Sequence, residues 1–249
     1  VVVKIKRNNI DTQINNTLFY IDYYVYFLQY IPFLNHLNLY QKFMEMKRIL
    51  LTQIDFNQEI KNLLLFKKFY QKLVKIPKVY PEISNNDIIV MEYLPGIKTD
   101  EMLEKVTKEE KQIMNKILYG FLITSTNIKG LFHSDLHSGN FSWVKNEDEK
   151  IELILYDFGL VGRLTHDRLQ ILNQFYLNLI NKDVNKIIES VNEIIIDKTD
   201  ILIKKKDLFD FELKVILDQK IREKNVHVFG WINEIIYLIN KYNLKLQNS

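Results

Sequence analysis

The sequence predicts an α+β protein with a small mixed lobe over residues 1–93 and a larger helical lobe over residues 94–249. Strand-like β-branched runs dominate the early part of the chain, and helical apolar spacing continues almost to the end beyond Thr165. Polar motifs lie between these two parts. Because ligands tend to bind in the cleft between lobes, we expect the functional site there.

Composition narrows the function classes. A chain of 249 residues with 47% hydrophobic content can bury a substantial core, so we expect a globular protein. The 34 basic and 31 acidic residues are too balanced for a dedicated nucleic-acid binder. The absence of cysteine excludes disulfides and thiolate metal sites and fits a reducing, intracellular compartment. The opening VVVKIKRNN shows no targeting peptide, and we expect the small lobe to be truncated at its N-terminus.

Residues 1–5 form a β-branched run followed by polar residues, which predicts a buried strand and a turn. Residues 17–34 are rich in Tyr and Phe, but Asp22, Gln29 and Pro32 interrupt them, so the run falls short of the roughly 20 apolar residues that span a membrane. A packed helix is the favoured interpretation. The alternative is a surface that meets a membrane or a partner, because Tyr and Phe suit half-wet interfaces.

Several further elements follow along the chain. Residues 38–73 have helical spacing, and the strand-like KIPKVY and IIVMEYLPGI predict a strand pair that leads into a hinge at Pro95-Gly96. Thr107 and Glu110 form a capping box, which predicts a long core helix that stops at Gly130. A polar NEDEK turn and the strand IELILY then precede DFG.

Three polar residues carry the most specific signal. Asp135 and Asn140 lie five positions apart in a loop after a core helix, and Asp157 follows a β-rich run and precedes Phe-Gly. In phosphoryl transfer this spacing lets one Asp accept a hydroxyl proton while the Asn and the second Asp bind Mg²⁺. Each residue alone is better explained as a turn or cap. Their order and flanking elements favour phosphoryl chemistry.

Other polar residues complete or compete with this site. Lys4, after three valines, is placed to hold nucleotide phosphates, with Lys6 on the same strand face as the fallback. Glu59 in a predicted helix is the expected partner of the lysine. The HxDxH pattern of His133 and His137 also suggests zinc, but without more ligands in a recognisable spacing we interpret both histidines as shaping the loop.

The motifs in order, VVVKIKRNNI, DFNQEIKN, PKVYPEIS, IIVMEYLPGIK, FHSDLHSGNF and LYDFGLVGRL, resemble those of the UbiB family of atypical kinases, which includes the ADCK proteins. This resemblance implies a two-lobed, protein kinase-like fold that binds ATP with Mg²⁺. It also implies a link to ubiquinone biosynthesis and to lipid-associated membranes, and hence a possible membrane surface or a lipid- or quinone-related ligand. Protein phosphorylation is not implied, because no segment ending in A-P-E follows Val161.

The resemblance assigns roles by position. It makes Asp135 the catalytic aspartate and Met91 the gatekeeper, and its cofactor-binding set is Lys4, Glu59, Glu92, Leu94, Asn140 and Asp157. Of these, Asn140 and Asp157 are the expected metal ligands, and Glu92 and Leu94 the expected hinge contacts to adenine.

Some positions depart from the family pattern. Gln53 stands where the family has a carboxylate, and Leu136 and Ser138 stand where it has prolines. Two alternatives to an ATPase or a small-molecule or lipid kinase therefore stay open: a catalytically weak pseudokinase or membrane-associated scaffold, and an aminoglycoside- or choline-type phosphotransferase. The phosphoryl acceptor and the oligomeric state are not predicted.

Overall fold

The computed structural model describes residues 1–249 apart from 32, 35–37, 196–199, 223–227, 243 and 245–249. The chain forms two compact units, which are described separately. Unit 1 comprises Val1–Ser125 and Phe132–Gly162, and unit 2 comprises Thr126–Leu131 and Arg163–Ser249. The lobe boundary expected between residues 93 and 94 stays a prediction.

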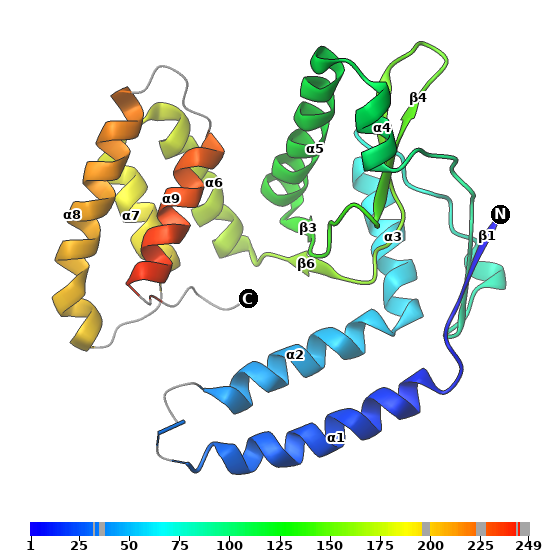
Figure 1. The fold of residues 1–249 in the computed structure, drawn as a ribbon, viewed down its shortest axis with the longest axis horizontal. Coiled ribbons are helices and arrows are strands. Elements are labelled where there is room, and N and C mark those ends of the chain that lie inside the picture. Colours follow the sequence, from blue (N-terminus) through cyan, green and yellow to red (C-terminus); the bar gives the residue numbers. More distant parts are fainter. Residues whose placement is uncertain (32, 35–37, 196–199, 223–227, 243, 245–249) are drawn as a thin grey trace. The chain divides into compact units, whose positions relative to one another are not determined.

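Figure 1 shows the elements in chain order. They are β1 (Val2–Ile5), α1 (Ile10–Leu28), α2 (Leu39–Gln53), α3 (Phe56–Tyr70), the single-turn η2 (Pro81–Ile83), β2 (Ile88–Met91), α4 (Thr99–Lys105), α5 (Lys108–Lys129), β3 (Leu131–His133), β4 (Phe141–Lys145), β5 (Ile151–Leu155), β6 (Val161–Arg163), α6 (His166–Asn181), α7 (Val184–Ile194), α8 (Asp200–Arg222) and α9 (Val228–Lys241). The protein is thus a mixed α+β fold with mostly helical content. Helices α1–α3 occupy much of the early part and four strands follow α5, which corrects the expected concentration of strands in the early part.

Strand β1 forms where the first strand was predicted, and it pairs antiparallel with β2 so that Lys4 lies opposite Ile89. It is not buried as predicted, because Val2, Val3 and Ile5 are exposed. The strand pair expected between residues 75–80 and β2 is reduced to a short antiparallel contact on the edge of β2 opposite to β1, where Tyr80 N donates to Val90 O at 2.9 Å and Glu92 N donates to Lys78 O at 2.7 Å. Only one bridge joins Val79 to Met91. On β2, the residues Ile89, Val90 and Met91 are all buried, so this strand has both faces covered.

Strands β4 and β5 form an antiparallel hairpin closed by the predicted polar turn at residues 146–150. The Asn146 side chain accepts hydrogen bonds from the backbone N–H groups of Asp148 (3.0 Å) and Lys150 (2.9 Å), which is the way Asn stabilises turns. Lys75 adds a bridge on the other side, since its N–H donates to Leu153 O at 2.8 Å. Strand β3 pairs with β6.

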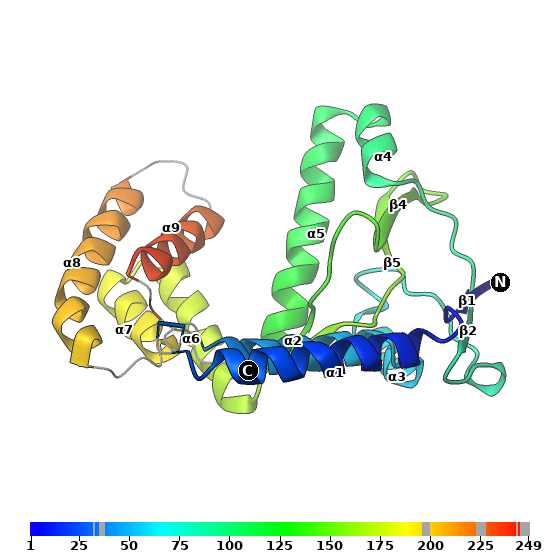
Figure 2. The ribbon, with the colours of Figure 1, turned by 60° about the horizontal axis from the view of Figure 1, so that its bottom comes forward.

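Helices α1 and α2 lie side by side as a hairpin, which Figures 1 and 2 both show. A helix forms within residues 17–34, but it begins earlier, at Ile10, and ends at Leu28. The expectation that its apolar run is packed is wrong for most of it, because its aromatic side chains are exposed. Leu18 of α1 and Phe43 of α2 are buried, and Lys47 Nζ donates to Asp22 Oδ2 at 2.6 Å.

Asp55 divides the helix expected over residues 38–73 into α2 and α3. Its backbone is extended and its side chain accepts from Gln58 N at 3.1 Å, so it caps α3. Helix α3 then buries its apolar stripe in the core of unit 1. The core members Leu63, Phe66 and Phe158 are completely buried, and the rings of Phe66 and Phe158 lie 5.3 Å apart.

Helix α5 confirms the predicted capping box. Glu110 N donates to Thr107 Oγ1 at 3.2 Å, and Thr107 N donates to Glu110 Oε2 at 2.9 Å. The helix ends at Lys129, and Gly130 has a φ of 63°, which favours glycine at this stop.

Unit 2 contains α6–α9, as the helical spacing beyond Thr165 predicts. Its core is built from apolar residues of all four helices: Phe175, Leu179, Ile187, Val191, Phe209, Leu213, Leu217, Trp231, Ile235, Leu238 and Ile239. Asn178 is buried beside this core, where its side chain donates to Lys186 O at 3.1 Å and to Ser190 Oγ at 2.9 Å.

Candidate functional site

Lys4 joins two carboxylates from distant parts of the chain. Its Nζ lies 2.8 Å from both carboxylate oxygens of Glu59 on α3 and 2.9 Å from Asp157 Oδ2, just after β5. Strand β1 directs the lysine, and the α3 cap at Asp55 sets the start of the helix that carries Glu59. The structure therefore brings together the lysine, helix glutamate and DFG aspartate that the sequence singled out.

The three charges respond differently to this environment. Burial lowers the pKa of the Lys4 ammonium, but the Glu59 and Asp157 carboxylates outweigh burial and hold that pKa above its ordinary 10.5. Burial raises the pKa of Glu59 above 4.5, and Lys4 offsets this only in part. For Asp157, burial is outweighed by Lys4 and the Gly159 N–H, and its pKa falls below 3.8. Asp157 is thus held as an anion, which metal binding requires.

The Asp135–Asn140 loop is closed by its own side chains. Asn140 Nδ2 donates to Asp135 O at 2.8 Å, which leaves Asn140 Oδ1 as the oxygen that a metal could use. The carbonyl of Asn140 accepts from Tyr156 N at 3.0 Å, so Asn140 lies beside the residue that precedes Asp157.

Two histidines shape this region, as predicted. Asp135 N donates to His133 Nδ1 at 3.3 Å, so the proton of the neutral ring lies on Nε2, which donates to Asp157 O at 2.5 Å. Burial lowers the pKa of His133 below 6.5, which keeps the ring neutral at pH 7. His137 Nδ1 accepts from Gly139 N at 3.1 Å and its Nε2 lies 3.7 Å from Asp135 Oδ2.

The expected hinge follows β2. The gatekeeper candidate Met91 is buried. Glu92 N donates to Lys78 O at 2.7 Å, and the hydroxyl of Tyr156 donates to Leu94 O at 3.1 Å. The hinge backbone is thereby tied to the segment before it and to the residue that precedes Asp157.

Carboxylate and amide oxygens at Asp157 and Asn140 fit a hard cation such as Mg²⁺, which takes oxygen ligands and usually retains waters or phosphate oxygens. Within the part of the chain that the structure describes, no three His, Cys, Asp or Glu side chains are grouped to hold a metal ion. A cation here would therefore need oxygens from a bound nucleotide as well.

Not every candidate joins the site. Lys6, the fallback lysine, lies 3.3 Å from Asp11 Oδ2, and no contact joins it to Glu59 or Asp157 among the described residues. Sequence reasoning missed Asn62, whose Nδ2 donates to Phe158 O at 2.9 Å. The signal that points to it is its spacing, because a residue three positions after Glu59 lies on the same face of a helix.

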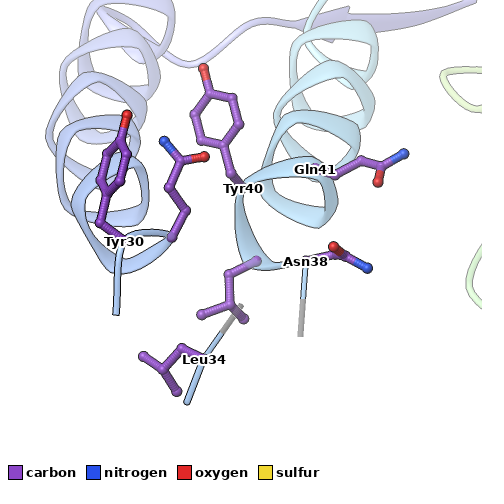
Figure 3. A pocket seen from close by; sticks show the side chains of 7 residues that line it. Tyr30, Leu34, Asn38, Tyr40 and Gln41 are labelled. Atoms are coloured by element: carbon purple, nitrogen blue, oxygen red, sulfur yellow. The ribbon is translucent and has the colours of Figure 1, made fainter. Parts of the chain in front are cut away.

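A separate cavity of about 540 Å³ lies where α1 leads into α2. Figure 3 shows Tyr30 and Tyr40 extending in the same direction from the facing ends of these helices. Those lining residues that the structure describes are uncharged and belong neither to the Lys4 contacts nor to the DFG segment: Gln29, Tyr30, Leu34, Asn38, Leu39, Tyr40 and Gln41.

The chain is similar to known proteins. The model of the ABC1 atypical kinase-like domain matches residues 1–191. ACTIVITY OF BC1 COMPLEX KINASE 7, chloroplastic, from Arabidopsis thaliana is 31% identical over 146 residues, which cover 57% of this chain and 20% of the relative. The probable protein kinase UbiB of Actinobacillus pleuropneumoniae serotype 7 (strain AP76) is 23% identical over 146 residues, or 57% of this chain and 27% of the relative. The chain thus spans about a fifth to a quarter of the length of these two relatives.

A solved structure resembles the fold. The complex of Rv3197 with erythromycin from Mycobacterium tuberculosis has a TM-score of 0.62 and 16% identity, and the match covers 97% of this chain and 67% of that one. Fold and site together define a kinase-like domain. The match over residues 1–191 then shows that the chain belongs to the ABC1 atypical kinase-like family, which confirms the resemblance to UbiB proteins.

Proposed function

We propose that this chain is a UbiB-like atypical kinase domain that binds ATP and Mg²⁺ and acts as an ATPase or as a small-molecule or lipid kinase. The observation that carries the proposal is the Lys4 ammonium between Glu59 and Asp157, at 2.8 and 2.9 Å. A lysine on a strand, a helix glutamate and a DFG aspartate are the parts that position nucleotide phosphates in kinases. Family membership favours this reading over an aminoglycoside- or choline-type phosphotransferase.

Each residue has a defined role in the proposal. Lys4 holds nucleotide phosphates, Glu59 orients Lys4, and Asp157 with Asn140 Oδ1 holds Mg²⁺, which neutralises phosphate charge when bound. Asp135 accepts the proton of the attacking hydroxyl or water. Its carboxylate is half-exposed and so can be reached by an acceptor.

Adenine would meet the hinge. Because the N–H of Glu92 and the carbonyl of Leu94 already have protein partners, the contacts to adenine fall to the Glu92 carbonyl and the Leu94 N–H.

The test is nucleotide binding with a matched carboxylate control. Isothermal titration with ATP and Mg²⁺ should show binding that Asp157→Asn removes. Asp148→Asn changes an exposed carboxylate in the β4–β5 turn and should leave binding unchanged. No binding of Mg²⁺-ATP to the wild-type chain would refute the proposal.

We extend the proposal to support of ubiquinone biosynthesis, on the basis of the UbiB relatives. Expression of the protein in a UbiB-deficient bacterium should restore ubiquinone, measured by chromatography. The Asp157→Asn variant should fail to restore it at equal protein abundance. Equal restoration by both proteins would separate the quinone role from the metal site.

A second candidate function, a membrane-associated scaffold, is favoured by the outer face of α1. The aromatic side chains of α1, and that of Tyr30 just after the helix, are all exposed, and we call them the α1 aromatic face: Phe19, Tyr20, Tyr23, Tyr24, Tyr26, Phe27 and Tyr30. The only charged residue within positions 19–30 is Asp22, which is paired with Lys47 of α2. No helix in the described residues is long and apolar enough to cross a membrane.

Uncharged tyrosine and phenylalanine suit the headgroup boundary of a bilayer, where one end of the ring is wet. We therefore propose that α1 lies on a lipid surface. Co-sedimentation with anionic liposomes should be lost in a Phe19→Ser/Tyr23→Ser/Phe27→Ser variant. The matched control is the exposed apolar stripe on α8, changed as Leu208→Ser/Phe211→Ser/Val215→Ser, which should leave sedimentation intact. Equal loss of co-sedimentation in both variants would indicate nonspecific binding through exposed apolar residues instead.

A further inference from the structure

Asn62 is a buried polar residue of α3 that none of the roles above uses. It is 8% exposed, and its Nδ2 donates to Phe158 O at 2.9 Å. Gln58 Nε2 donates to Asn62 Oδ1 at 3.0 Å. The Phe158 carbonyl fixes the orientation of the Asn62 amide, because a carbonyl can only accept and the NH₂ group of Asn62 must therefore face it.

Helix α3 holds both polar groups of the Phe158 backbone. The Phe158 N–H donates to the Glu59 carboxylate, and the Phe158 carbonyl accepts from Asn62. Glu59 and Asn62 are three positions apart and so lie on one face of the helix. The Phe158 ring is buried against Phe66. Burial of the ring does not set the orientation of the peptides on either side of Phe158, so these two hydrogen bonds set it.

The neighbouring peptides set the carboxylate of Asp157. Gly159 N donates to Asp157 Oδ1 at 2.8 Å, and His133 holds Asp157 O from the side of β3. The Phe158 carbonyl belongs to the peptide whose N–H is that of Gly159. A change in the position of this carbonyl therefore moves the N–H that orients the Asp157 carboxylate.

We propose that Asn62 is a positioning residue that ties the DFG segment to α3 and so holds Asp157 in its metal-binding orientation. The part of this inference that concerns metal rests on the proposed function. The part that concerns the order of residues 157–159 does not, and the experiment measures the two separately.

Two variants and a matched control define the test. Asn62→Leu removes the donor at similar volume, and Asn62→Asp keeps the shape but replaces the donor with an acceptor. Asn178 is also a buried asparagine that donates to a backbone carbonyl, in unit 2. Asn178→Leu and Asn178→Asp therefore carry a similar structural defect away from the DFG segment.

The first measurement is backbone hydrogen exchange in the ligand-free chain. Both Asn62 variants should raise exchange in residues 157–160 by about tenfold or more, because a buried carbonyl loses its partner, while β4 and β5 keep their protection. The Asn178 variants should leave residues 157–160 unchanged. Unchanged exchange there in the Asn62 variants would overturn the inference.

The second measurement compares ATP affinity with Mg²⁺ and with EDTA. In the Asn62 variants, the gain in ATP affinity that Mg²⁺ provides should be smaller by about tenfold. Their ATP affinity in EDTA should stay within about twofold of that of the wild type. A parallel fall in both affinities would indicate a merely structural role and overturn the inference. If the wild-type chain binds no nucleotide, the proposed function fails, and the exchange measurement alone decides the role of Asn62.

Discussion

The substitution Lys4→Met removes the only cation in contact with Glu59 and Asp157 among the described residues, while keeping the length and apolar stem of the side chain. Glu59 is 1% exposed, and after the change its carboxylate would be buried beside Asp157 with no counter-charge. We expect a large loss of stability in unit 1, although the side chain lies near the start of the chain.

The magnitude follows from the two ion pairs. Removing one partner of a buried pair costs about 3–5 kcal/mol. Lys4 and Asp157 are each about a third exposed, and Glu59 can take up a proton, so solvent screening reduces the expected loss to about 2–3 kcal/mol. For a chain of this size the melting temperature should fall by roughly 4–12 °C.

The assay must report on unit 1 alone. The chain has two tryptophans, and both are buried, Trp143 in unit 1 and Trp231 in unit 2. A Trp231→Phe background leaves Trp143 fluorescence as a probe of unit 1 during urea unfolding. Lys4→Met/Glu59→Gln is the matched variant, and it should regain about half of the lost stability or more, because the fully buried charge of Glu59 is removed and only the part-exposed Asp157 carboxylate stays without a counter-charge.

The sign of the pH dependence provides a second check. Without Lys4 the folded-state pKa of Glu59 rises further above its ordinary 4.5. Between pH 4.5 and this raised pKa, the folded state therefore binds more protons than the unfolded state. The loss in Lys4→Met should therefore be greatest near pH 8 and shrink as pH falls toward 4.5. A loss below about 0.5 kcal/mol, or one that is the same at pH 5 and pH 8, would refute the electrostatic reasoning.

Three further substitutions test local packing. A Cβ at Gly96 would overlap Ser142 Oγ, so Gly96→Ala should destabilise unit 1 by about 1–3 kcal/mol in urea unfolding. Gly120→Ala meets no atom within 4 Å in the middle of α5 and should stabilise by about 0.5–1 kcal/mol, so a loss there would contradict the α5 geometry. Thr107→Ala removes the α5 cap and should lower the free energy of unfolding by about 1 kcal/mol in the same urea assay. No change would show that Glu110 alone caps the helix.

Local sequence signals were enough for much of the fold. The Thr107–Glu110 capping box and the stop at Gly130 predicted both ends of α5, because caps depend on residues only a few positions apart. The chemistry of the site was equally local at Asp135 and Asn140, where the spacing of five positions allows the side chain of one to bond the backbone of the other.

Long-range pairing could not be predicted in the same way. The sequence favoured a strand pair between residues 75–80 and β2, of which the structure keeps one bridge, Val79 to Met91. The pairing of β2 with β1 was not predicted, because no local turn joins these two strands. The division between α2 and α3 at Asp55 was missed because helical apolar spacing continues on both sides of it. Asn62 was missed because its partner, the Phe158 carbonyl, lies 96 positions away.

The contacts among Lys4, Glu59 and Asp157 also could not be predicted from local sequence patterns. Lys4 is 55 positions from Glu59 and 153 from Asp157, so no turn or helix spacing relates them. One ammonium between two carboxylates leaves this cluster with an excess of negative charge, which favours a divalent cation. Because α3 holds Phe158 through Glu59 and Asn62, that charge cluster and the DFG backbone depend on the same helix. Movement of α3 would therefore change the Lys4 contact and the Asp157 carboxylate together.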